Sequence, residues 1–195
     1  RFYEIQSGQI RIGDQPIQNI ELEDLRQHVG LVTQDVQLFN ASVRDNLALF
    51  RPNVSDDKII TILEELGLST WYNALPNGLD TELTTGGSGL SAGEAQLLAF
   101  TRVFLKDPGL VILDEPSSRL DPATEQNINR AVERLLQDRT GIIIAHRLDT
   151  VQRVDNILIL DHGNVQEFGP RSELVTNPNS QFSKLLKTGL EELII

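Results

Sequence analysis

The sequence predicts an α/β domain that is built around a mainly parallel sheet and carries an inserted helical lobe. Two short apolar runs, Leu110–Leu113 and Ile142–Ala145, are typical of strands covered on both faces. Such strands alternate along the chain with amphipathic helices, which favours a parallel sheet. Between Gln34 and Asp107 the patterns are almost purely helical, so we expect this stretch to form a lobe of its own.

The predicted strands are short and are bounded by turn residues or polar residues. Two alternating segments flank His162 and Gly163, so a hairpin is expected about this dipeptide. The strands are predicted at residues 8–14, 28–34, 110–113, 140–146, 156–161 and 164–169.

The predicted helices combine apolar residues at helical spacing with recognisable end signals. Ser55 is placed to cap one helix and Gly67 to end it. Asp121 is placed to cap another, with Pro122 at its first position. The helices are predicted at residues 42–50, 55–67, 91–106 and 121–138 and in the last segment of the chain.

The composition excludes several classes of protein and site. The 195 residues suffice for one domain with a sizeable core, and the formal net charge of −11 repels nucleic acid and anionic lipid. The absence of cysteine excludes disulfides and thiolate metal sites, and the three histidines lack the spacing of a zinc site. No apolar run approaches the ~18 residues of a membrane span, and no signal peptide is recognisable. Because the chain begins at Arg1 in mid-pattern, we expect a piece of a longer protein.

Three of the predicted strands end in polar residues that could meet at one edge of the sheet. Asp114 and Glu115 follow the strand at 110–113, Gln34 ends an earlier strand and His146 ends a later one. In open α/β sheets, ligands bind at the carboxyl ends of the strands. Each residue alone also fits an ordinary role, such as a solvated strand end or the start of a turn.

Together these four residues fit nucleotide hydrolysis. Asp114 could hold Mg²⁺ through its waters, because this ion prefers oxygen ligands and sheds water reluctantly. Glu115 could orient and polarise an attacking water. Gln34 could contact both the metal and the water, and His146 could donate to a γ-phosphate oxygen. Phosphoryl transfer needs mainly positioning and charge stabilisation, which such a set supplies.

The stretch from Leu90 to Gln96 has two interpretations. Ser91 and Glu94 have the spacing of a capping box, which needs no ligand. Alternatively, Gly93 lets a phosphate approach the free N–H groups at the start of the helix. Both can hold together, and the capping box is favoured when the segment is taken alone.

The order of these segments resembles the nucleotide-binding domain of ABC transporters over the whole chain. Five motifs follow one another as in that family: Gln34 matches the Q-loop, Leu90–Glu94 the LSGGQ signature, Leu110–Glu115 the Walker B strand, Ser118–Asp121 the D-loop and His146 the switch histidine. The segment Asp35–Leu47 is also similar to exporter-type domains, which couple to their membrane helices just after the Q-loop.

The resemblance implies a P-loop NTPase-like fold in two lobes. Residues 1–34 and 107–195 would form a RecA-like catalytic lobe, and residues 35–106 a helical lobe that carries the signature. The implied place of action is the cytoplasmic face of a membrane, with the domain either peripheral or fused to a transmembrane domain. The implied partners are transmembrane domains and a second ABC nucleotide-binding domain, and no nucleic acid.

The resemblance also implies a composite site, in which two domains sandwich two ATP molecules with Mg²⁺. The catalytic residues would be Glu115, His146 and Gln34, and the metal would be held by Asp114 and Gln34. The partner chain would contribute Ser91 and Gly93 to each site, and the residues expected to bind the nucleotide are Ser91, Ala92, Gly93, Glu94 and Asp121.

The sequence departs from the family's pattern in several places. It contains no G-x-x-x-x-G-K-[ST] motif, and in the family this phosphate loop, with its strand and helix, lies just upstream of the segment that begins at Arg1. We therefore expect a truncation before that loop, and negligible ATP hydrolysis by this fragment alone. Ala92 and Glu94 replace a Gly and the Gln of the signature, and residues 81–87 lack the Glu-Arg-Gly of exporters.

Two other functions stay open at this point. A non-hydrolytic dimerisation or regulatory module could keep the fold without the phosphate loop, and a GK[ST] motif in the upstream coding sequence would argue against it. A soluble relative that acts on DNA or ribosomes is disfavoured by the acidic composition and by the exporter-like segment Asp35–Leu47.

Overall fold

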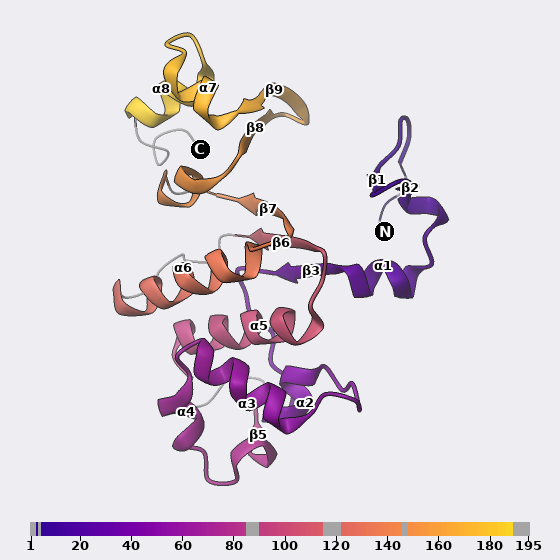
Figure 1. The fold of residues 1–195 in the computed structure, drawn as a ribbon, viewed down its shortest axis with the longest axis vertical. Coiled ribbons are helices and arrows are strands. Elements are labelled where there is room, and N and C mark those ends of the chain that lie inside the picture. Colours follow the sequence, from indigo (N-terminus) through magenta and orange to yellow (C-terminus); the bar gives the residue numbers. More distant parts are fainter. Residues whose placement is uncertain (1–2, 4, 85–89, 115–121, 146–147, 189–195) are drawn as a thin grey trace. The chain divides into compact units, whose positions relative to one another are not determined.

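The computed structural model describes residues 3, 5–84, 90–114, 122–145 and 148–188. The chain falls into two compact units, Arg1–Ile142 and Ile143–Ile195. Figure 1 shows the elements of both units. The lobes predicted from the sequence divide the chain at other points, after residues 34 and 106, and stay a prediction.

Strands and helices alternate from β5 to β7, whereas other parts of the chain hold pairs of strands or runs of helices (Figure 1). The strands are β1 (Arg11–Ile12), β2 (Gln15–Pro16), β3 (Val29–Val32), β4 (Ala41–Ser42), β5 (Glu82–Leu83), β6 (Leu110–Asp114), β7 (Thr140–Ile144), β8 (Asn156–Asp161) and β9 (Asn164–Pro170). The α-helices are α1 (Leu22–His28), α2 (Val43–Ala48), α3 (Asp56–Glu65), α4 (Ser69–Asn73), α5 (Ala92–Lys106), α6 (Pro122–Leu136), α7 (Arg171–Thr176) and α8 (Gln181–Thr188). Short 3₁₀ turns are η1 (Ile17–Asn19), η2 (Gly78–Asp80) and η3 (Leu148–Arg153).

The strands β3, β6 and β7 are neighbours in one sheet, in that order. β3 and β6 pair in parallel, with Val29 opposite Leu110 and Val32 opposite Leu113. The arrows of the three strands point the same way (Figure 1). Helix α6 connects β6 to β7, as parallel neighbours require. The predicted α/β fold with a mainly parallel central sheet is therefore confirmed.

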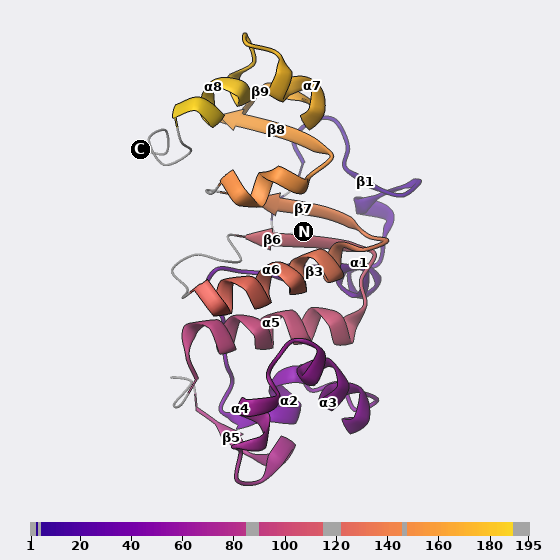
Figure 2. The ribbon, with the colours of Figure 1, turned by 60° about the vertical axis from the view of Figure 1, so that its left-hand side comes forward.

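Helices α5 and α6 cover one face of this sheet (Figure 2). Val32, Val111 and Leu113 are fully buried there. Gly30 allows a close approach of α5, because a Cβ at this position would lie 2.6 Å from Cγ1 of Val103. This face of the strands therefore packs against the apolar stripe of α5.

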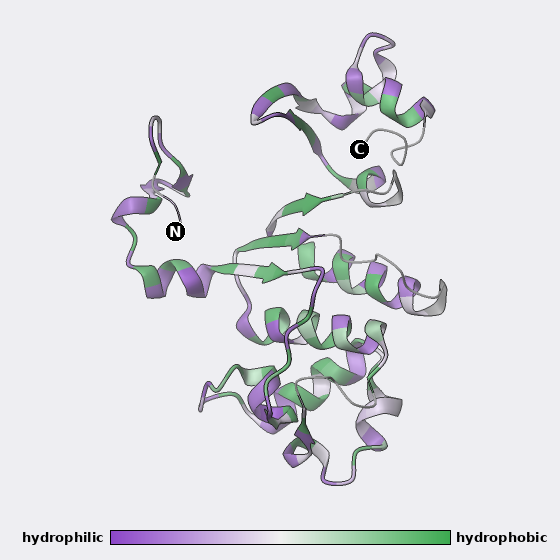
Figure 3. Cartoon of the chain, turned by 180° about the vertical axis from the view of Figure 1, so that it is seen from behind, coloured by the Kyte–Doolittle hydropathy of each residue, from purple (hydrophilic) through white to green (hydrophobic). Residues whose placement is uncertain are grey.

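The opposite face of the same strands is much less covered. Leu31 keeps 57% of its surface exposed and Ile142 keeps 50%, while Ile112 is half-buried. Figure 3 shows that β3, β6 and β7 are largely apolar. The expectation that these strands are covered on both faces is therefore wrong for the described residues, because α5 and α6 both lie on the same side.

Residues 35–106 contain helices α2 to α5, but they are not as purely helical as predicted. A small antiparallel pair forms between β4 and β5, with Ala41 opposite Leu83. These partners are far apart in the sequence, so neither segment shows a local strand pattern. The cap predicted at Ser55 is confirmed, because its hydroxyl accepts a hydrogen bond from the backbone N–H of Lys58.

The ends of several predicted strands need correction. β3 ends at Val32 rather than at Gln34, because the hydroxyl of Thr33 donates to the carbonyl oxygen of Asp35 and the chain bends there. β7 ends at Ile144. The strand predicted at residues 8–14 is reduced to β1, which pairs with β2 in a small antiparallel hairpin.

The second unit contains the predicted hairpin, which is confirmed. β8 and β9 pair in antiparallel fashion, and His162 and Gly163 join them with φ angles of 46° and 76°. Glu167 on β9 accepts hydrogen bonds from the backbone N–H groups of Gln181 and Phe182, and so caps α8 from a distance. Across the ranges given above, no helix has the length and apolar character that a membrane crossing needs.

Candidate functional site

The carboxyl ends of β3 and β6 place two of the predicted site residues at one edge of the sheet. Val32 lies opposite Leu113 in the parallel register, so Asp114 is the next residue beyond this pair on β6, and Gln34 comes two residues beyond it after β3. Asp114 is partly exposed as the last residue of β6, and Gln34 is exposed at the bend after β3. A partly exposed carboxylate and an exposed amide therefore follow strand ends at the edge where open α/β sheets bind their ligands.

The other catalytic candidates lie outside the described residues. Glu115 directly follows Asp114, and Asp121 directly precedes α6. His146 comes two residues after the end of β7, the strand next to β6. The described residues contain no group of three His, Cys, Asp or Glu side chains that could hold a metal ion. The roles of Glu115, Asp121 and His146 stay predictions.

The signature segment forms the N-terminus of α5 and is a complete capping box. The carboxylate of Glu94 accepts the backbone N–H of Ser91 at 2.8 Å, and the hydroxyl oxygen of Ser91 accepts the backbone N–H of Glu94 at 3.2 Å. The capping interpretation is therefore confirmed. The hydroxyl group of Ser91 keeps its own hydrogen as a donor, and Ser91 and Ala92 are both exposed.

Gly93 has a packing reason that the sequence did not reveal. It is buried, and a Cβ at this position would lie only 2.0 Å from Cγ2 of Thr124 on α6. The glycine therefore allows α5 and α6 to pack closely at this point. A role of Gly93 in phosphate binding stays a prediction, and the helix contact alone accounts for the residue type.

Two side chains of α5 attach this helix to the backbone of β3. The side-chain amide of Gln96 donates to the carbonyl oxygen of Thr33 at 3.4 Å, and Nζ of Lys106 donates to that of Val29 at 2.8 Å. Burial, followed by the nearby charge of Arg51, lowers the pKa of Lys106 from its ordinary value. The helix that begins at the signature thus holds the strand that ends before Gln34.

A polar network that the sequence did not predict lies beyond Gln34. Asn46 is fully buried in α2, and Arg102 lies in the middle of the apolar helix α5. The guanidinium of Arg102 donates to the side-chain and main-chain oxygens of Asn46. The available signal was a lone arginine inside the run LLAFTRVFL, at a position where the helical stripe is otherwise apolar.

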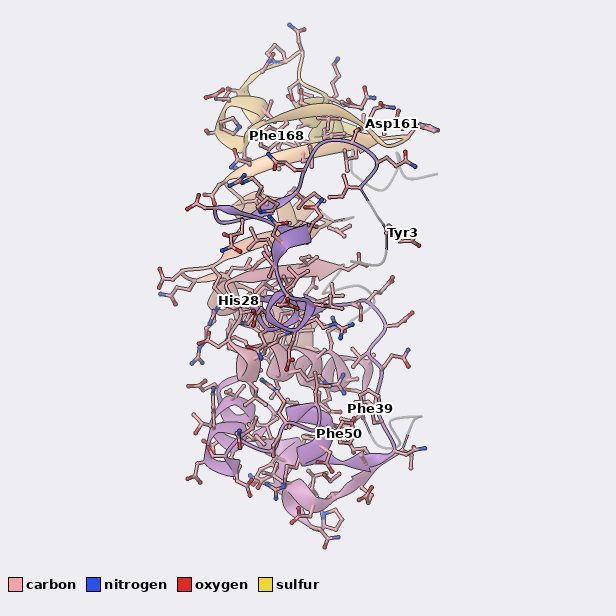
Figure 4. The ribbon with its side chains drawn as sticks, turned by 90° about the vertical axis from the view of Figure 1, so that its right-hand side faces the viewer. Tyr3, His28, Phe39, Phe50, Asp161 and Phe168 are labelled. Carbon is pink, nitrogen blue, oxygen red and sulfur yellow. The ribbon has the colours of Figure 1, made fainter. Side chains whose placement is uncertain are left out.

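An exposed apolar patch lies close to this network. We call Phe39, Leu49 and Phe50 the aromatic patch, and their exposed fractions are 44%, 43% and 58%. The rings of Phe39 and Phe50 meet edge to face with centroids 5.6 Å apart (Figure 4). The patch belongs to the region around the segment Asp35–Leu47, which the sequence singled out as exporter-like.

A hollow of about 270 Å³ lies elsewhere, between the end of α3 and α6. Gly67, Asn127 and Arg134 are among the residues that line it. Arg134 pairs there with Glu65 at 2.7 Å. None of the predicted site residues lines this hollow, so it adds nothing to the edge formed by β3 and β6.

Comparison with known proteins identifies the family. The ABC transporter family profile matches residues 1–118. The chain is 41% identical over 175 residues to the uncharacterized ABC transporter ATP-binding protein YfiC of Bacillus subtilis, covering 90% of this chain and 29% of that protein. It is 40% identical over 188 residues to the mitochondrial iron-sulfur clusters transporter ABCB7 of Homo sapiens, covering 96% of this chain and 25% of that protein.

A solved structure supports the same assignment. The structure of a bacterial Atm1-family ABC exporter with ATP bound superposes with a TM-score of 0.85 and 34% sequence identity, covering 96% of this chain and 33% of that one. This likeness confirms the predicted P-loop NTPase-like fold. The chain spans less than a third of the length of the relatives it matches. The profile match and these similarities show that the chain belongs to the ABC transporter family and corresponds to the ATP-binding part of its exporters.

Proposed function

We propose that this chain is the ATP-binding and ATP-hydrolysing part of an exporter, in which it drives the movement of a substrate across a membrane. The parallel register of β3 and β6 supports this most directly, because it brings Gln34 and Asp114 to one edge of the sheet. The names of the relatives, which describe transporters and ATP-binding proteins, give independent support. The chain spans less than a third of the length of those relatives, so transport by the whole protein is part of this proposal.

The residues at the sheet edge fit the chemistry of ATP hydrolysis. The carboxylate of Asp114 and the side-chain oxygen of Gln34 are the kind of ligand that Mg²⁺ prefers. When bound, this ion would neutralise charge on the phosphates. Glu115 would orient the attacking water and accept its proton, while His146 would donate a hydrogen bond to an oxygen of the γ-phosphate.

The signature segment would complete the site of a second copy of this domain. Ser91 and Ala92 are exposed at the N-terminus of α5, a helix of 15 residues whose first N–H groups point outward along its axis. Gly93, Glu94 and Asp121 would lie beside the same phosphates. Each ATP would then be held between Asp114 and Glu115 of one chain and Ser91 of the other, so hydrolysis would require a dimer.

The aromatic patch would receive the transmembrane partner. Phe39, Leu49 and Phe50 offer exposed apolar surface next to the segment that follows Gln34. The domain would therefore lie at the cytoplasmic face of a membrane, either fused to its transmembrane domain or bound to it. Nucleic acid is not an expected partner, because the formal net charge is −11.

A second candidate is a non-hydrolytic dimerisation module of the same fold. These 195 residues contain no G-x-x-x-x-G-K-[ST] motif, and such a motif upstream of Arg1 in the full-length protein would rule this candidate out. Such a module would use the signature end of α5 for pairing and would leave ATP intact. The two candidates differ in whether the full-length protein turns over ATP.

The test is made in the full-length protein that contains this chain. We expect Glu115→Gln to abolish steady-state ATP hydrolysis, to retain ATP and to trap a dimer, because the amide keeps the shape of the side chain and removes the base. Asp114→Asn should instead weaken Mg²⁺-dependent binding of ATP. Glu23→Gln, on the exposed side of α1, is the matched control and should behave as wild type. Equal hydrolysis by wild type and Glu115→Gln would show that the base lies elsewhere.

A further inference from the structure

Arg102 connects the middle of α5 to the chain on the far side of Gln34. Its Nε donates to the carbonyl oxygen of Asn46 at 2.9 Å, and its Nη1 donates to that of Gln37 at 2.8 Å. Its Nη2 donates to Oδ1 of Asn46 at 3.3 Å. Three N–H groups that point in different directions therefore serve three oxygens on a loop and a helix that are distant from Arg102 in the sequence.

These acceptors are amide oxygens without a net charge. Burial lowers the pKa of Arg102 from its ordinary value. Removing a cation from water is costly, and neutral acceptors compensate for it less well than a carboxylate does. An apolar residue would fill this position in the apolar stripe of α5 at a lower cost. The arginine therefore points to a need for its hydrogen-bond geometry.

Asn46, which is bonded to Arg102, is also hydrogen-bonded to Phe39 of the aromatic patch. Its Nδ2 donates to the carbonyl oxygen of Phe39 at 3.0 Å, and its Oδ1 accepts the backbone N–H of Phe39 at 2.8 Å. Nδ2 also lies within hydrogen-bond distance of the carbonyl oxygens of Ala41 and Ser42. Both backbone polar groups of Phe39 are thus fixed by Asn46, whose side chain is in turn fixed by Arg102.

The same helix holds the chain before Gln34. Gln96 donates to the carbonyl oxygen of Thr33, and Val103 packs against Gly30 of β3. Helix α5 is therefore hydrogen-bonded to the chain both before and after Gln34, through Gln96 to Thr33 and through Arg102 to Gln37. The signature end of α5, the segment around Gln34 and the aromatic patch are consequently parts of one hydrogen-bonded assembly.

We propose that Arg102 is a positioning residue that ties the segment from Gln37 to Asn46 to α5, so that a displacement at Ser91 is passed to the aromatic patch as a rigid movement. The tie itself depends only on the geometry described above. Its use for coupling rests on the proposed function, in which Ser91 contacts ATP and the patch contacts the membrane partner. The two parts of the proposal need separate measurements.

The tie is tested by amide hydrogen exchange in the full-length protein. Arg102→Lys keeps a charge and a long apolar stem, but one ammonium group cannot serve three separated acceptors. We expect exchange at the amide of Phe39 to rise about tenfold or more, as the loss of hydrogen bonds to a charged group implies. Arg102→Leu should do the same. Exchange at Phe39 that stays within about twofold of wild type in both variants would overturn the proposal.

A matched control separates the tie from a general loss of stability. Arg139 also donates to a main-chain oxygen, that of Leu135, and pairs with Asp107. Arg139→Lys should loosen the end of α6 and leave the amide of Phe39 as in wild type. Asn46→Leu provides a second variant, because it removes both the Oδ1 that accepts the Phe39 N–H and the Nδ2 that donates to the Phe39 carbonyl oxygen, so it should also accelerate exchange. If Arg139→Lys accelerated exchange at Phe39 as strongly as Arg102→Lys, the specific tie would be refuted.

The coupling is tested by measuring transport and ATP turnover together. We expect Arg102→Lys to lower the amount of substrate moved per ATP hydrolysed, while Arg139→Lys leaves this ratio unchanged. Faster exchange at Phe39 with an unchanged ratio would refute the transmission and leave the tie. If the wild-type protein did not hydrolyse ATP at all, the proposed function would fail, and the exchange measurement would still decide whether the tie exists.

Discussion

The two ends of helix α5 differ in how they are held. At its N-terminus, Ser91 and Glu94 bond to each other within one turn, and Ser91 is exposed. Toward its C-terminus, Phe100 and Leu105 are buried, and Arg102 donates to the backbone of other segments. The helix is packed against other elements from Gly93 onward, and at its N-terminus only Ser91 and Ala92 are exposed. This is the arrangement expected of an element that offers a ligand-binding end on a rigid support.

The two parts of α5 should therefore differ in how strongly a substitution lowers the stability of the protein. A lost helix cap destabilises a protein by about 0.5–2 kcal/mol, whereas a lost large core side chain costs about 3–5 kcal/mol. Departures from the family's signature, Ala92 and Glu94, fall at the end where changes affect folding least. Their effect is therefore expected on nucleotide chemistry and not on stability.

The largest effect is expected at the anchored end. Phe100 is fully buried, so Phe100→Ala should lower the free energy of unfolding by about 3–5 kcal/mol through lost apolar contact and a cavity. Phe50→Ala, in the exposed aromatic patch, is the control and should lower it by less than about 1 kcal/mol. Urea unfolding of the chain, followed by circular dichroism, measures both. Similar losses in the two variants would contradict the contrast between anchored and exposed aromatic residues.

An intermediate effect is expected where the signature end meets α6. Gly93→Ala brings a methyl group against Cγ2 of Thr124 and should cost about 1–3 kcal/mol of unfolding free energy. Thr124→Ser removes that methyl group and keeps the hydroxyl, so the double variant should recover part of the loss. The same urea titration measures this recovery. If stability returned and ATP turnover of the full-length protein did not, Gly93 would serve the phosphates as well as the packing.

The smallest effect concerns the charge of Lys106. Because burial, followed by Arg51, lowers its pKa, the unfolded chain binds this proton more tightly than the folded chain. The resulting destabilisation is fully present below the folded pKa and is relieved as the pH rises from that value toward 10.5. Lys106→Met keeps the stem and removes the charge, so the rise of stability in this alkaline window should be smaller. If the free energy of unfolding, measured with urea, rose equally with pH in wild type and in Lys106→Met, the buried charge of Lys106 would not be the cause.

What the sequence predicted correctly were features with local signals. The caps at Ser55 and Ser91 depend on residues three positions apart, and the parallel strands show as short apolar runs. The sequence also predicted that Gln34 and Asp114 follow the ends of neighbouring strands, and the parallel register of β3 and β6 agrees, although β3 stops at Val32; the roles of the two residues stay predictions.

The features that were missed depend on pairs far apart in the chain. Arg102 and Asn46 are separated by 56 positions, and Gly93 meets a residue of the next helix, Thr124. A single sequence shows such residues only as local anomalies, such as an arginine within an apolar helix. Their partners become visible only when the packing of α5 is known.

The composite site is the central claim, and trans-complementation tests it most directly. Ser91→Arg should place a bulky cation at the signature end, and Glu115→Gln should remove the base, so each full-length variant alone should lose ATP turnover. In a dimer of one copy of each, one site combines an intact Glu115 with an intact Ser91 of the other chain. We predict that mixing the two variants before assembly restores ATP turnover clearly above that of either one alone. Turnover that stays at the level of the single variants, while mixed dimers form and bind ATP, would contradict a site shared between two chains.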